Sequence, residues 1–118
     1  MSGTRDEKIA AARARMAELA AKFVDRSGRE FESLRAGLAR FAAGDATALD
    51  DIRHLAHRMC GTGATLGFGV LSDCAARIEH LADAQTPGKK PDESALTRFA
   101  AGLEALGAEL MRLRADPS

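Results

Sequence analysis

The chain has 118 residues, 46% of them hydrophobic, and its 17 Lys and Arg residues balance 17 Asp and Glu residues. This length suits a single domain spanning residues 1–118, and the zero net charge argues against a nucleic-acid partner, which usually requires a basic excess. No apolar run is long enough to span a membrane, and the N-terminus lacks the apolar region of a secretory signal. We therefore expect a cytoplasmic protein, with no membrane partner, whose two cysteines are thiols.

The spacing of apolar residues predicts five helical segments. The first covers about residues 4–25 and the second about 27–42. Their apolar stripes stay nearly in phase across Ser27 and Gly28, so one long helix is an open alternative. A clear break follows at Gly44 and Asp45, because glycine suits the left-handed end of a helix and Asp can cap the next one.

The other three segments cover about residues 46–65, 69–84 and 92–114. Gly67 and Gly69 predict the turn between the first two of these, and no segment alternates with the period of a strand. Short loops between amphipathic helices predict an all-α fold, an up-and-down four-helix bundle with an additional N-terminal helix. We expect a monomer in which the last helix packs inside the bundle, with dimerisation through its apolar seam as the alternative.

His57 is predicted to lie on the exposed face of the third segment. At about 100° per residue, it falls roughly 145° from the centre of the apolar face between Leu49 and Met59. Gly61 follows one turn later on the same face. A glycine within a helix costs about 1 kcal/mol relative to alanine, and on a surface it leaves room for another backbone or a phosphoryl group.

The stretch AHRMCGTGATLGF, residues 56–68, resembles the signature of histidine-containing phosphotransfer (HPt) domains. The matching positions are His57, Gly61, the small residues at 62–64, Leu66 and Gly67. The resemblance extends over about residues 16–113. It implies a helical bundle that presents the histidine on an accessible helix.

One position departs from the family pattern. The usual lysine, three residues after the histidine, is Cys60 in this chain. A thiol supplies no positive charge beside a phosphoryl group. Arg53, His54 or Arg58 could compensate for the missing cation.

The resemblance implies a phosphoryl carrier in a multistep His–Asp phosphorelay of two-component signalling. His57 would accept a phosphoryl group from the aspartate of a receiver domain and pass it to another receiver. The residues expected to support the phosphoryl group or the docking are Arg53, His54, Arg58, Cys60, Gly61 and Ala64, with Asp73, Ala76 and Arg77 on the next helix.

The partners that the resemblance implies are response-regulator receiver domains, with a hybrid sensor histidine kinase as a further candidate. It implies no independent kinase activity and no cofactor of its own, with Mg²⁺ expected on the partner receiver domain.

Two alternatives stay open. The first is a helical adaptor that binds receivers or kinases without carrying phosphate, because the lysine is missing. The second is a metal site built from His54, His57 and Cys60, with Cys74 and His80 on the next helix. The common zinc signatures have other spacings, so this site would be a weak one.

Overall fold

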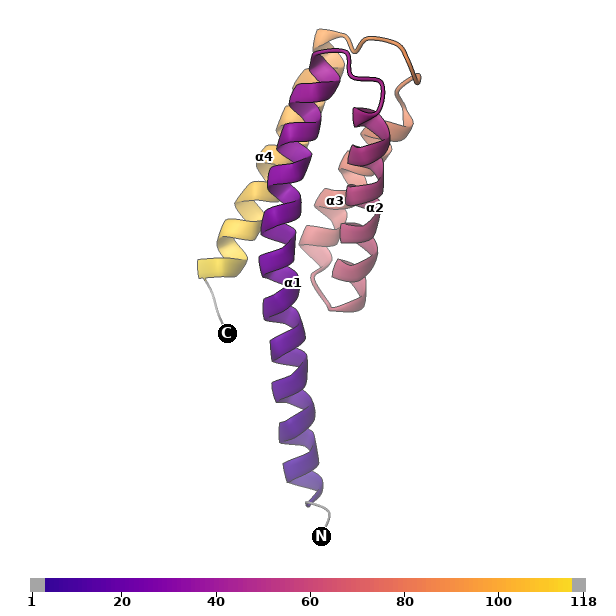
Figure 1. The fold of residues 1–118 in the computed structure, drawn as a ribbon. Helices are drawn as coiled ribbons and strands as arrows, with labels where there is room; N and C mark the ends of the chain where they lie inside the picture. The colour runs from indigo at the N-terminus through magenta and orange to yellow at the C-terminus, as the bar shows by residue number, and fades with distance from the viewer. Residues whose placement is uncertain (1–3, 116–118) are drawn as a thin grey trace.

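The computed structural model describes residues 4–115, which form four α-helices and, over that range, no strand. They are α1 (Arg5–Ala42), α2 (Ala48–Thr65), α3 (Gly69–Asp83) and α4 (Glu93–Ala115). Consecutive helices run in opposite directions, and α1 also packs against α4, which closes the bundle (Figure 1). The all-α, up-and-down bundle predicted from the sequence is confirmed.

α1 is one continuous helix, so the two segments expected at about 4–25 and 27–42 are a single element. It begins at a capping box, in which Thr4 accepts a hydrogen bond from the backbone N–H of Glu7. Ser27 and Gly28 do not interrupt it, and both are buried. A Cβ at Gly28 would overlap the guanidinium of Arg114, so this glycine is covered by a side chain of α4 and does not end a helix. The additional N-terminal helix is therefore the first half of α1.

The first half of α1 projects beyond the bundle (Figure 1). At about 1.5 Å per residue, the 38 residues of α1 span about 57 Å, whereas the 18 residues of α2 span about 27 Å. Phe23 is the first buried residue along α1. The large apolar side chains before it, Ile9, Met16 and Leu19, are 41%, 51% and 46% exposed.

The two turns that flank α2 use glycine as the sequence predicts. Gly44 and Gly67 have φ angles of +93° and +85°, which favour glycine over other residues. Asp45 accepts a hydrogen bond from the backbone N–H of Thr47, which occupies the N-cap of α2. The guanidinium of Arg40 donates to Asp45 at 2.8 Å. Together with hydrogen bonds from the backbone N–H and the hydroxyl of Thr47, it lowers the pKa of that carboxyl to about 2. These contacts fix the direction in which α2 leaves α1.

The core side of α2 determines which residues of that helix face outward. Leu49, Ile52, Ala56 and Met59 are all buried, so the opposite face of the helix is exposed. Among residues 4–115, no helix combines the length and apolarity required to cross a bilayer.

The α2–α3 turn rests on α1 through an aromatic contact. Phe68, in the turn, stacks on Phe23 with the two ring centroids 5.4 Å apart. The turn is therefore anchored close to the point where α1 leaves the bundle.

The two halves of α1 are expected to respond differently to truncation of an apolar side chain. Leu34 is fully buried, so Leu34→Ala should lower the free energy of unfolding by about 2–5 kcal/mol. Met16→Ala, on the projecting half, should change it by no more than about 0.5 kcal/mol. Urea denaturation followed by circular dichroism measures both. Equal losses would contradict an unpacked N-terminal half.

Candidate functional site

His57 lies on the exposed face of α2, as the helical wheel predicts, and its side chain is 73% exposed. Its Nδ1 is 2.7 Å from Oε2 of Glu79 on α3. An ionised carboxylate only accepts hydrogen bonds, so Nδ1 carries the proton and donates it to Glu79. In the neutral ring, Nε2 then holds the lone pair. The contact therefore fixes both the tautomer and the orientation of an accessible imidazole.

Glu79 is the functional residue that the sequence analysis missed. Its side chain is 24% exposed, so it lies partly between the helices and not on the open surface. One signal could have found it. The short turn at Gly67 makes α2 and α3 antiparallel neighbours, so a residue ten positions before that glycine faces one about as many positions after it.

His54 lies one turn before His57 and is also exposed. Its Nδ1 is 2.8 Å from the backbone carbonyl oxygen of Asp50, to which it donates. His54 therefore has the same tautomer as His57. Its partner, however, is a neutral carbonyl instead of a carboxylate, so a positive charge on its ring would be less well stabilised.

Arg53 is on the α3 side of α2, but two carboxylates already engage it. Its Nη2 is 2.9 Å from Asp50, and its Nε is 3.9 Å from Asp83 on α3. The hydrogen bond to Asp50 raises the pKa of Arg53 and lowers that of Asp50. Arg53 would therefore have to leave these two carboxylates before its positive charge could reach a phosphoryl group on His57.

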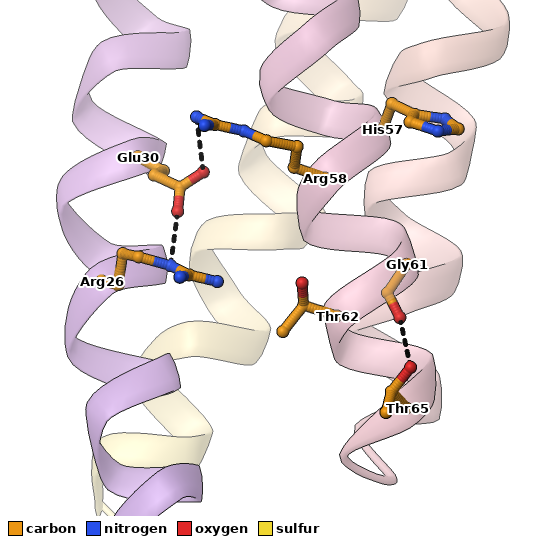
Figure 2. Close-up of a pocket in the computed structure, with 7 residues that line it drawn as sticks. All are labelled: Arg26, Glu30, His57, Arg58, Gly61, Thr62 and Thr65. Carbon is orange, nitrogen blue, oxygen red and sulfur yellow. Dashed lines mark hydrogen bonds and ion pairs between the residues drawn. The ribbon is translucent and has the colours of Figure 1, made fainter.

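Arg58 points away from the imidazole. Figure 2 shows His57 leaving α2 on the side of α3 and Arg58 leaving it on the side of α1. Arg58 reaches Glu30 of α1 at 3.7 Å, and Glu30 also pairs with Arg26 at 3.0 Å. This arrangement does not place the Arg58 charge beside His57.

A groove runs along the exposed face of α2 toward α1 (Figure 2). We call it the His57 groove, and its lining residues are Arg26, Glu30, His57, Arg58, Gly61, Thr62 and Thr65. Of the residues predicted to form the site, it brings together His57, Arg58 and Gly61. The contributions of Arg26 and Glu30, on another helix, were not predicted.

Gly61 and Gly63 have different structural roles. Gly61 is exposed, and a Cβ there would meet no atom within 4 Å, so no packing requirement explains it. Gly63 is buried, and its Cβ would contact Leu71, Ser72 and Phe23 at 3.4–3.6 Å. Gly61, one turn after the histidine, therefore leaves the surface open, whereas Gly63 is part of the packed interface with α1 and α3.

Cys60, at the position of the family's lysine, is half-buried against α3. Its carbonyl oxygen accepts a hydrogen bond of 2.8 Å from Ser72, and its Sγ is 3.5 Å from the same hydroxyl. This side chain links α2 to α3 and brings no charge to the surface.

The remaining predicted residues lie outside the His57 groove. Ala64 is exposed on α2; on α3, Asp73 and Arg77 are exposed and Ala76 is half-buried. The contact that α3 makes with His57 comes from Glu79 instead.

The side chains that were considered as metal ligands on α2 each have a different partner. His54 binds a backbone carbonyl, His57 binds Glu79 and Cys60 turns to Ser72. Over residues 4–115, no three or more His, Cys, Asp or Glu side chains are grouped so that they could hold a metal ion.

Comparison with protein-family models matches residues 18–109 to the Hpt domain. This range includes His57, Glu79 and the whole lining of the His57 groove. Comparisons with curated proteins and with solved structures gave no significant match. The matched residues, together with the helical bundle and its exposed histidine, lead to one conclusion: the chain belongs to the Hpt domain family of phosphoryl carriers, which act in phosphorelay signalling and are not kinases.

Proposed function

We propose that His57 is the residue that carries the phosphoryl group, taking it from the aspartate of one receiver domain and giving it to the aspartate of another. The observation that supports this most strongly is the contact with Glu79. It leaves the lone pair on Nε2 of an imidazole that is 73% exposed. A neutral imidazole is a competent nucleophile near neutral pH.

In the proposed transfer, one bond to phosphorus forms, one breaks, and His57 loses no proton. The Nε2 lone pair attacks the phosphorus of an aspartyl phosphate and forms an N–P bond. The bond between phosphorus and the aspartate oxygen breaks, and its electron pair returns to the carboxylate. The ring then carries a positive charge with the proton still on Nδ1, where Glu79 stabilises it at 2.7 Å. The reverse steps deliver the phosphoryl group to a second receiver.

This chain positions the nucleophile for the transfer and contributes little positive charge beside it. The α3 side of the site holds Glu79 and Asp83, and the cation there, Arg53, is already paired. We expect Mg²⁺, bound by the receiver's own carboxylates, to neutralise the transferring phosphoryl group. With a thiol in place of the lysine, we expect phospho-His57 to be weakly stabilised and so to pass its phosphoryl group on readily.

The direct test is transfer from a panel of radiolabelled phospho-receiver domains to the wild-type chain, His57→Gln and His54→Gln. We expect an acid-labile, base-stable label on the wild type and on His54→Gln, and none on His57→Gln. His54→Gln is the matched control, because His54 has the same tautomer one turn away. If no receiver labels the chain but one binds it equally well after His57→Gln, the protein is an adaptor.

Without the Glu79 carboxylate, the proton of the neutral His57 ring should no longer be held on Nδ1. In Glu79→Ala, the ¹⁵N chemical shifts of the His57 ring should move from the Nδ1–H form toward the mixture of a free imidazole. Transfer from a phospho-receiver should slow by roughly ten- to a hundredfold, the loss seen when the carboxylate that orients a metal-bound histidine is removed, because the ring loses the same kind of orientation. Receiver binding should not change. An unaltered tautomer in Glu79→Ala would show that another group orients the ring.

Replacing Gly61 by alanine should stabilise the fold and at the same time slow phosphoryl transfer. Gly61→Ala meets no atom within 4 Å, so it should raise the free energy of unfolding by about 1 kcal/mol through helix propensity. The same methyl group should hold a docked receiver away from Nε2 and slow transfer by about tenfold or more. Gly69→Ala, equally open but at the start of α3, is the control and should leave transfer unchanged. A more stable Gly61→Ala variant with unaltered transfer would place the docking surface elsewhere.

A further inference from the structure

The projecting half of α1 carries an apolar stripe that no other helix covers over residues 4–115. We call it the N-terminal stripe, and it consists of Ile9, Met16 and Leu19, each at least 41% exposed. It continues the face on which Phe23 and Leu34 are buried in the bundle. The core-facing side of α1 therefore extends past the end of the bundle into solvent.

One edge of the N-terminal stripe is basic. Lys8, Arg15 and Lys22 recur every seven residues, a spacing that drifts by only about 20° around a helix. We call them the basic edge. All three are exposed, and within the described residues none of them forms an ion pair. Of the acidic residues of this part of the helix, Glu7, Glu18 and Asp25 lie opposite the N-terminal stripe on the helical wheel, next to the basic edge. Asp6 lies on the other edge of the stripe.

The basic edge faces the side of the bundle that carries His57. Leu19, Lys22 and the acidic Asp25 line a second groove with Thr62 and Thr65 of α2, in which Arg26 and Arg29 keep the charge basic. This groove shares Arg26, Thr62 and Thr65 with the His57 groove, in which Figure 2 shows them. The surface is therefore continuous from the imidazole to the N-terminal stripe.

A second copy of this chain is a poor occupant for the stripe. An antiparallel copy would bring two basic edges together, which repel. A parallel copy would set each basic edge against the other edge, where Arg13 and Asp6 stand, so that one carboxylate would face three cations. An anionic membrane also fits poorly, because the polar face of a helix that lies on such a membrane is rich in Lys and Arg, whereas here it carries Glu and Asp.

A protein surface with an apolar centre and an acidic edge complements the stripe. Such a partner can reach it while docked at the histidine. Arg15 lies 11 residues before Arg26, a rise of about 16 Å along α1, and a small domain is about 30 Å across.

We propose that the receiver domain docked at His57 makes a second contact with the N-terminal stripe, through an apolar patch edged by Asp or Glu side chains. This inference rests on the proposed function, because it takes the partner to be the receiver that exchanges phosphoryl groups with His57. The contact adds affinity and selects among receivers by charge, and it takes no part in the chemistry.

The test measures the affinity of a panel of purified receiver domains for the full chain, by calorimetry at low and high salt. Arg15→Glu/Lys22→Glu reverses the basic edge. Ala14→Glu/Ala21→Glu adds two glutamates in the same turns but on the opposite, exposed face, and serves as the matched control. The same measurement on His57→Gln reports binding independently of phosphoryl transfer.

We expect the basic-edge variant to lose about tenfold or more in affinity for the receivers that bind the wild type, with the loss shrinking at high salt. The control variant should bind as the wild type does. At saturating receiver, the basic-edge variant should still label His57 fully.

Equal affinity of the two variants would overturn the second contact while leaving phosphoryl transfer untouched. Binding without labelling would instead overturn the proposed function, and the affinity comparison would still decide the second contact. The absence of any receiver binding would overturn both. A dimer that Met16→Asn/Leu19→Asn dissociates, or binding to phosphatidylserine vesicles by the basic edge, would assign the stripe to a different occupant.

Discussion

The hydrogen bond between His57 and Glu79 is the interaction on which the site depends. It spans two helices, so it exists only when α2 and α3 pack in one register. Gly63 is buried at the contact between the two helices, and the Ser72 hydroxyl bonded to the Cys60 carbonyl fixes the register one turn after His57. The packing of α2 against α3 thus determines the tautomer of an exposed histidine.

The same constraint explains the roles of the small residues that follow the histidine. Gly67 reverses the chain at φ +85°, Gly63 is buried against α1 and α3, and Gly61 leaves the surface of α2 bare one turn after His57. The stability lost through these glycines is recovered elsewhere, in the buried apolar side chains of all four helices.

The sequence predicted the features of the site that depend on one helix. The apolar face of α2 determines its exposed face, so the positions of His57 and Gly61 could be read from a helical wheel. Glu79 and Glu30 could not be read in this way, since each belongs to another helix and its direction depends on tertiary packing. The same limit applies to Arg58, whose flexible side chain turns toward α1 and not toward the imidazole.

The number of helices was uncertain for a related reason. Ser27 and Gly28 have the local character of a helix end, and local propensity cannot report the Arg114 guanidinium that occupies the space above the glycine. This tertiary contact covers Gly28, and α1 continues through both residues.

The measurement that tests the account most directly is ¹⁵N and ³¹P NMR of the wild-type chain after it has been phosphorylated by a receiver domain. The account predicts a phosphoryl group on Nε2 of His57, with the Nδ1 proton retained and bonded to Glu79. A phosphoryl group on Nδ1 of His57, or on His54, would contradict it.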